Sequence, residues 1–184
     1  MNAGKSTSLL QSSHNYRERG MATLLLTPKL DDRTGDHTIA SRIGLSAEAT
    51  VFGANTDLIQ LFAAHQEQDK LACVLIDEAQ FLSEIQVRQL CHIADDSNIP
   101  ILCYGLRTDF QGKLFPGSAA LLGWADNLIE LKTICHCGRK ATMNLRRDAS
   151  GAPVKEGDQV EIGGNERYIA LCRKHFFESL RKEC

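Results

Sequence analysis

The first residues of this sequence that could perform chemistry form the triplet Gly4-Lys5-Ser6, which matches the second half of a phosphate-binding loop. In the full motif, G-x-x-x-x-G-K-[ST], backbone N–H groups surround the phosphates, the lysine reaches the terminal ones and the hydroxyl binds magnesium. The alternative is a polar N-terminal segment with a solvated lysine. The motif predicts binding of nucleotide phosphates by Met1, Asn2, Ala3, Gly4, Lys5, Ser6 and Thr7.

The glycine and the strand that open this motif would fall just before Met1. Two interpretations stay open, a start codon assigned too late and a true truncation. On either one, we expect the chain as given to bind ATP poorly, because backbone donors to the phosphates would be missing. Extension upstream by about ten residues that complete the loop is expected to raise stability and restore activity.

A second group of reactive residues follows the apolar run Cys73-Val74-Leu75-Ile76. Such a run predicts a buried parallel strand, which delivers the next residues, Asp77 and Glu78, to the carboxyl edge of a sheet. Asp77 could then hold magnesium, and Glu78 could transfer a proton. The alternative is a strand that simply ends in a polar loop.

A third group comprises cysteines and a histidine in the last third of the chain. Cys135, Cys137, Cys172 and His175 supply a candidate ligand set for a tetrahedral structural zinc ion, with His136 as the main competing ligand. Residues 139–171 show two alternating stretches and several glycines, which predicts a β-hairpin with a flexible loop. A hairpin of this size rarely holds itself, so a metal clamp at its base makes physical sense.

The elements that must position these groups follow from periodicity and capping signals. Helices are predicted from Ser6 to a stop at Gly20, from Thr56 to about Gln68 with Asn55 or Thr56 as cap, after Ser83 with Gln86 in a capping box, and over Ser118–Trp124. Strands are predicted at Ala22–Thr27, Cys73–Ile76, Ile101–Leu106 and Leu128–Lys132. This alternation predicts an α/β fold, with a parallel sheet that carries helices on both faces.

Composition limits the classes of protein that fit. The chain has 184 residues, of which 43% are hydrophobic and 24% charged, and its formal net charge is −2. It contains no apolar run of roughly 20 residues and no basic-then-apolar leader, so we expect a soluble protein without a membrane partner. The near-neutral charge gives no basic stripe for nucleic acid, so long polynucleotides are not expected as partners.

Together, these motifs resemble the cytosolic (type II) thymidine kinase family, of the bacterial type. The resemblance rests on Gly4-Lys5-Ser6-Thr7, on Asp77-Glu78-Ala79-Gln80-Phe81, and on the cysteine and histidine clamp that encloses Gly163-Gly164-Asn165-Glu166-Arg167-Tyr168. It implies a P-loop, RecA-like kinase core over residues 1–132, with its first strand missing. It also implies a zinc-clamped hairpin or lasso domain over residues 133–184.

The resemblance implies transfer of the ATP γ-phosphate to the 5′-hydroxyl of thymidine, with Glu78 as the base that accepts the hydroxyl proton. Ser6 and Asp77 would hold Mg²⁺, and Asp31, Asp32, Arg33 and Gln80 would join the loop around ATP. The implied thymidine-binding residues are Phe81, Leu106, Phe110, Gln159, Val160, Glu161, Ile162, Gly163 and Tyr168, with Phe110 packing on thymine and Tyr168 closing a lid. The family is also cytoplasmic, homotetrameric and inhibited by thymidine triphosphate.

Two other classes of function stay open from the residues alone. Asp77-Glu78-Ala79-Gln80 also resembles the second motif of helicases, but a nucleic-acid motor normally needs two ATPase domains and a basic surface. A zinc-binding module that keeps an inactive or impaired nucleotide fold is the other class. Thymidine-dependent release of ADP would separate the three.

Overall fold

The computed structural model describes residues 3–29, 37–160 and 167–181. These residues divide into two compact units. The sheet unit, as we name it, holds Gly4–Leu106 and Pro116–Leu128, and the clamp unit holds Ala3, Arg107–Phe115 and the described residues from Ile129 onward. Residues 107–115 therefore belong to the clamp unit although they lie far upstream of its main segment. The domain boundary predicted at residues 132 and 133 stays a prediction.

The sheet unit contains most of the helices and strands. In chain order they are α1 (Lys5–Arg17), β1 (Ala22–Pro28), β2 (Thr38–Ala40), β3 (Ser46–Glu48), β4 (Thr50–Phe52), α2 (Leu58–Gln66), β5 (Leu71–Ile76), the 3-10 turn η1 (Ala79–Phe81), α3 (Glu84–Ser97), β6 (Ile101–Cys103) and α4 (Pro116–Trp124). Four of the strands form a parallel sheet in the order β4-β1-β5-β6, and β2 pairs with β3 in a separate antiparallel ribbon.

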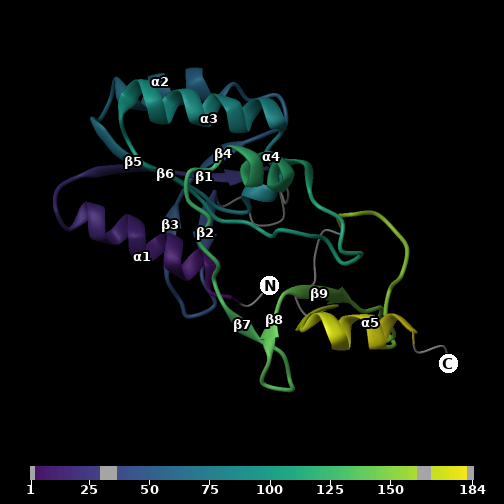
Figure 1. The fold of residues 1–184 in the computed structure, drawn as a ribbon. Coiled ribbons are helices and arrows are strands. Elements are labelled where there is room, and N and C mark those ends of the chain that lie inside the picture. Colours follow the sequence, from purple (N-terminus) through teal and green to yellow (C-terminus); the bar gives the residue numbers. More distant parts are fainter. Residues whose placement is uncertain (1–2, 30–36, 161–166, 182–184) are drawn as a thin grey trace. The chain divides into compact units, whose positions relative to one another are not determined.

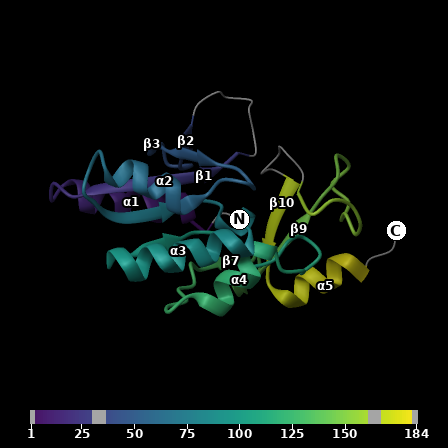
Figure 2. The ribbon, with the colours of Figure 1, turned by 90° about the horizontal axis from the view of Figure 1, so that it is seen from above.

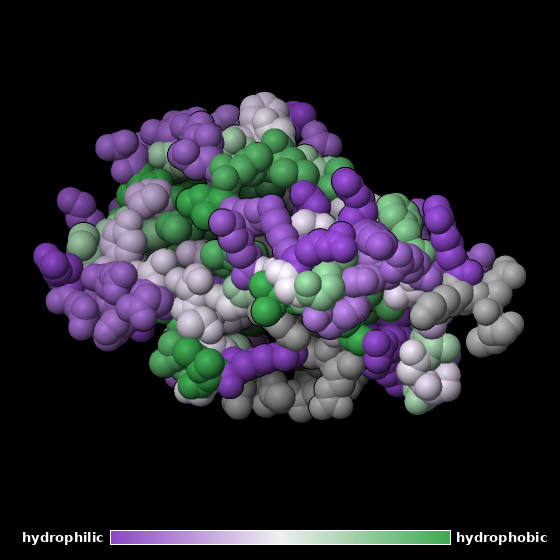
Figure 3. All heavy atoms as spheres, turned by 60° about the horizontal axis from the view of Figure 1, so that its bottom comes forward, coloured by the Kyte–Doolittle hydropathy of each residue, from purple (hydrophilic) through white to green (hydrophobic). Residues whose placement is uncertain are grey.

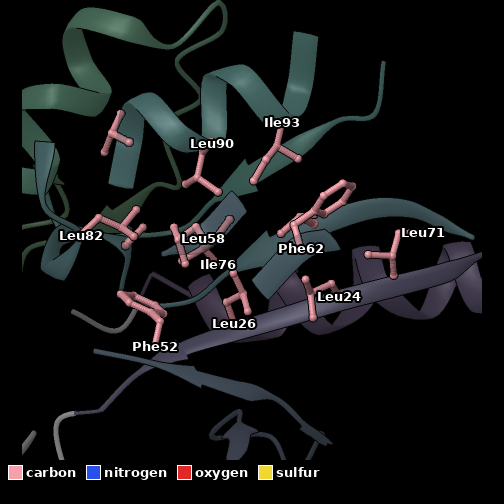
Figure 4. Packing of buried hydrophobic residues seen from close by; sticks show 13 residues of the cluster. Leu24, Leu26, Phe52, Leu58, Phe62, Leu71, Ile76, Leu82, Leu90 and Ile93 are labelled. Atoms are coloured by element: carbon pink, nitrogen blue, oxygen red, sulfur yellow. The ribbon is translucent and has the colours of Figure 1, made fainter. Parts of the chain in front are cut away.

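Helices cover both faces of this sheet, as the sequence predicts for an α/β fold (Figure 1). One face packs against α2 and α3 through a large apolar cluster, in which Leu26 and Ile76 of neighbouring strands lie under Leu90 and Ile93 of α3 (Figure 4). The other face packs against α1 through a second cluster that includes Leu9 and Leu75. Burial on both faces explains why β1 and β5 are continuous apolar runs rather than alternating ones.

Local signals explain where two of the helices begin. The capping box predicted for α3 is confirmed, because the Ser83 hydroxyl accepts from the Gln86 N–H at 3.2 Å and the Gln86 amide oxygen accepts from the Ser83 N–H at 3.0 Å. The cap predicted for α2 is wrong. Asp57 caps α2 with bonds from the N–H groups of Ile59 and Gln60, because its carboxylate reaches both donors of the first turn.

One predicted strand and several predicted boundaries also differ from the structure. The helix after Ser6 ends at Arg17, before Gly20, and the strand from Ile101 ends at Cys103 rather than Leu106. The strand predicted at Leu128–Lys132 does not form. Leu128 and Ile129 are 64% and 85% exposed, so no neighbouring strand or helix buries the apolar side chains on which that prediction rested.

The clamp unit is built from short elements: β7 (Thr133–Ile134), β8 (Lys140–Ala141), β9 (Met143–Arg146), β10 (Tyr168–Leu171) and α5 (Arg173–Arg181). β9 and β10 pair antiparallel, which confirms the predicted hairpin, and α5 lies beside both strands (Figure 2). Leu145, Leu171 and Phe176 form a small apolar core together with Cys135 and Cys172. Because this core is small, a bound metal ion could contribute to the stability of the clamp unit.

Hydrophilic and hydrophobic side chains are interspersed on the face that Figure 3 shows. Among the described residues, no helix combines the length and the apolar character that crossing a bilayer requires.

Candidate active site and metal centre

The residues predicted to bind phosphate lie where the chain enters α1. Gly4 has φ of 74°, in the left-handed region that glycine adopts without strain, and Lys5 is the first residue of the helix. The side chain of Lys5 is 13% exposed. Backbone N–H groups at the start of a helix favour an anion, and the lysine adds a full positive charge beside them. The local geometry therefore suits a phosphate.

Ser6 and Asp77 lie together although they are far apart in the sequence. The Ser6 hydroxyl donates to Oδ2 of Asp77 at 2.8 Å, because α1 packs beside β5 and Asp77 directly follows that strand. A hydroxyl and a carboxylate are oxygen ligands of the type that Mg²⁺ takes, together with water and phosphate. The donor set thus fits the predicted magnesium site, and an ion bound there would neutralise phosphate charge.

The surroundings of Asp77 affect its ionisation. Burial raises the pKa of the Asp77 carboxyl, and the neighbouring negative charge of Glu78 raises it further. The Ser6 hydroxyl, the Glu78 N–H and the Lys5 ammonium act in the opposite direction but do not cancel the rise in pKa. A bound cation would favour the ionised carboxylate and so would act against this rise in pKa.

Glu78 stands in an unusual backbone conformation, with φ of 46° and ψ of 42°. A non-glycine residue there is strained, and such strain occurs frequently at functional sites. One carboxylate oxygen, Oε1, lies 3.7 Å from Nζ of Lys5, and the other, Oε2, accepts from Nε2 of Gln80 at 2.6 Å. The Glu78 side chain remains 37% exposed, so it can meet a substrate hydroxyl.

Phe81 and Leu106, the two remaining predicted residues of the sheet unit, lie near this group along the chain. Phe81 ends η1 and is half-buried. Leu106 is half-buried, and its N–H donates to Oε1 of Gln80 at 2.9 Å. Gln80 is buried, and both the nitrogen and the oxygen of its side-chain amide form hydrogen bonds within the protein, to Glu78 and to Leu106.

In the clamp unit, Phe110 is buried and lies against Arg146. The guanidinium carbon of Arg146 is 3.7 Å from the centroid of the Phe110 ring, and Nη1 of Arg146 donates to the carbonyl of Asp158 at 2.9 Å. Gln159 is held in the same region, since its amide nitrogen donates to Oδ2 of buried Asp109 at 2.9 Å. Phe110 and the segment that starts at Gln159 are thus linked through two charged residues.

Sequence reasoning gave no role to Asp109 or Arg146. Arg146 sits at the end of a short strand with no motif around it, and only its burial indicates a special position. It also lies opposite Tyr168 in the β9–β10 ladder, which places that predicted lid residue next to it. Val160 is partly exposed.

The predicted zinc ligands form one cluster. Cys135, Cys137, Cys172 and His175 place one ligand atom each within 4.8 Å of all the others. Sγ of Cys137 is 3.9 Å from Sγ of Cys172, and Nδ1 of His175 is 3.3 Å from Sγ of Cys135. A tetrahedral zinc ion about 2.3 Å from each sulfur sets sulfur atoms about 3.8 Å apart, so the cluster fits this ion.

Neighbouring groups favour the thiolate form of Cys135 in this cluster. Burial alone would raise the pKa of the Cys135 thiol, but backbone N–H groups of Cys137 and Cys172, with help from His175, lower that pKa to about 5. Thiolates are the form that zinc binds. His136, the competing ligand, stacks on the His175 ring at 4.3 Å between centroids and lies outside the cluster.

Several predicted residues lie outside the described part of the chain, and their positions stay predictions. They are Met1, Asn2, Asp31, Asp32, Arg33, Glu161, Ile162 and Gly163.

The model of the thymidine kinase family matches residues 1–176. A thymidine kinase of Novosphingobium aromaticivorans is 66% identical over 98% of this chain and 94% of its own length. Thymidine kinases of Shewanella oneidensis and Yersinia pseudotuberculosis are 61% and 55% identical over 97% and 100% of this chain, and 93% and 94% of their own lengths.

Proposed function

Because the chain belongs to the thymidine kinase family, we propose that it transfers the γ-phosphate of ATP to the 5′-hydroxyl of thymidine and forms dTMP. The observation that carries this proposal is the group of Lys5, Ser6, Asp77 and Glu78 at the edge of the parallel sheet. Phosphoryl transfer needs positioning and charge stabilisation more than covalent chemistry, and this group offers both.

Each residue has one part in the reaction. Lys5 and the backbone at the start of α1 bind the ATP phosphates, and Ser6 and Asp77 hold Mg²⁺. Glu78 accepts the proton of the thymidine 5′-hydroxyl as that oxygen attacks the γ-phosphorus. Its Oε1 is the oxygen we assign to this proton, because Gln80 occupies Oε2.

Thymine recognition is proposed for the clamp unit. Phe110 packs on the base, and backbone groups of residues 159–163 bond its edge, with Tyr168 closing over it. The bond from the Gln159 side chain to Asp109 supports this, because it leaves the backbone of Gln159 as the group that reads the base. Phe81 and Leu106 are further residues that we propose for thymidine binding, on the basis of the family resemblance.

Assembly and regulation follow the family resemblance as further parts of the proposal. We expect a cytoplasmic homotetramer that its end product, thymidine triphosphate, inhibits.

The comparisons give no support to a nucleic-acid-dependent ATPase.

Release of ADP in the steady state tests the proposed function. We expect ADP release that requires thymidine and magnesium and that rises with thymidine to saturation. Single-stranded DNA or RNA should leave the rate unchanged. ADP release that depends on polynucleotide, or a protein that releases no ADP with thymidine, would contradict the proposal.

Replacement of Arg146 tests the thymidine side of the site. We expect Arg146→Met to raise the KM for thymidine by about tenfold, on the scale of a desolvated cation–π contact, and to leave the KM for ATP nearly unchanged. The reason is that Arg146 joins Phe110 to the carbonyl of Asp158, just before the segment proposed to read thymine. Initial rates with each substrate varied in turn measure both constants.

The matched control for this variant is Arg147→Met, since Arg147 is the next residue and its side chain is exposed. The control should keep the parental KM for thymidine. An equal rise in both variants, or none in Arg146→Met, would remove Arg146 from the thymidine site.

A further inference from the structure

Gln80 is an uncharged side chain placed directly against the proposed base. It lies in the 3-10 turn after Glu78 and is 2% exposed. Its Nε2 donates to Oε2 of Glu78 at 2.6 Å, and its Oε1 accepts from the Leu106 N–H at 2.9 Å. These two partners fix which end of the amide is nitrogen, because the reverse orientation would bring oxygen against a carboxylate and nitrogen against an N–H group.

Glu78 needs such a partner to hold one position. Its carboxylate is 37% exposed, and its other oxygen is 3.7 Å from the Lys5 ammonium, beyond the length of a direct hydrogen bond. A partly exposed glutamate samples several rotamers unless a short bond restrains it. The 2.6 Å bond from Gln80 is the shortest described contact of this carboxylate.

Gln80 is itself held firmly by elements on its other side. The backbone of Leu106 is held at both ends. Its N–H donates to Gln80, and its carbonyl accepts from the Ser118 hydroxyl of α4 at 2.6 Å. Gly105 lies so close that a Cβ at this position would be 3.0 Å from both N and Oε1 of Gln80. The residues after β6 therefore restrict the position of the Gln80 side-chain amide.

We propose that Gln80 is a positioning residue for phosphoryl transfer, which orients the Glu78 carboxylate toward the substrate hydroxyl and ties it to the Leu106 peptide. The proposal rests on the proposed function. Gln80 supplies a fixed geometry for the Glu78 base. This matters because a base displaced by about 1 Å can lower the rate of a reaction by about 10²-fold. Gln80 need not touch ATP to have this effect.

The alternative is a purely structural glutamine that only satisfies the buried Leu106 N–H. Gln80→Glu separates the two, since it keeps the shape and the oxygen that accepts from Leu106 but replaces the donor to Glu78 by a second carboxylate oxygen. We expect kcat to fall by about 10²-fold while the KM values for ATP and thymidine change little. A structural glutamine would leave kcat unchanged.

A double variant sharpens this test. Glu78→Gln combined with Gln80→Glu restores the hydrogen bond with donor and acceptor exchanged. Its melting temperature should exceed that of Gln80→Glu alone, and its kcat should equal that of Glu78→Gln alone. If Gln80→Glu lowered kcat as much in the Glu78→Gln background as in the parent, the effect would not pass through Glu78, and the proposal would be overturned.

Gln89→Glu provides a matched control. Gln89 makes the same pair of contacts elsewhere, since its Oε1 accepts from the Leu58 N–H at 3.1 Å and its Nε2 donates to the Asp57 carboxylate at 3.1 Å. This variant should lower the melting temperature but keep the parental kcat.

Should Gln80→Glu prove too unstable to assay, Gln80→Met removes both bonds at similar length, and it should lower kcat with little change in KM. Parental kcat in either Gln80 variant overturns the positioning role while the proposed function stands. A parent without thymidine-dependent turnover refutes the proposed function instead, and the positioning role falls with it.

Discussion

The Glu78→Gln variant should phosphorylate thymidine about 10²–10⁴-fold more slowly than the unchanged chain, which is the usual scale for loss of a general base. The amide keeps the size of the side chain but cannot accept a proton from the 5′-hydroxyl. Glu78 is suited to this role by its partial exposure and by its place one residue after Asp77 at the sheet edge. Single-turnover measurements with saturating ATP and thymidine give the rate of the chemical step.

Binding of ATP should survive this substitution, because it leaves unchanged Lys5, Ser6 and Asp77, the residues proposed to hold the phosphates and the metal. The rise in melting temperature caused by ATP and magnesium measures that binding. Glu84→Gln serves as the control, since Glu84 is an exposed glutamate on α3 that pairs with Arg88. Unchanged turnover in Glu78→Gln would mean that another group accepts the proton.

The second large effect is expected at the metal cluster. The unchanged protein should contain about one zinc ion per chain, and Cys172→Ser should contain almost none. Cys172 contributes a ligand and also begins the turn into α5, where its carbonyl accepts from the Phe176 N–H at 3.0 Å. Metal analysis of the purified, folded proteins measures the zinc content.

Loss of zinc should loosen the clamp unit more than the sheet unit. The clamp unit has a small apolar core around Phe176, whereas the sheet unit has two apolar clusters on its sheet. Hydrogen exchange should therefore speed up in β9 and β10 and stay slow in β5. Cys91→Ser, outside the cluster, should keep its zinc, and a folded parent without zinc would show that the cluster serves another purpose.

The sequence by itself determined the reactive groups and the class of fold. Gly4-Lys5-Ser6 and the run that ends in Asp77-Glu78 each lie within a few residues, so local spacing is enough to identify them. The buried character of β1 and β5 follows from their apolar runs, and α3 from its capping box. The cluster of candidate zinc ligands was also predictable, because two short motifs supply all four donor atoms.

Only the tertiary structure decided how these groups meet. The Ser6–Asp77 bond joins residues 71 positions apart, and the Gln80–Leu106 bond joins residues 26 positions apart. The same holds for Arg146 over Phe110, and for the failure of Leu128–Lys132 to become a strand. Contacts of this kind depend on which surfaces pack together. The energy of such a side chain is set by its burial and by partners that are distant in sequence, rather than by local propensity.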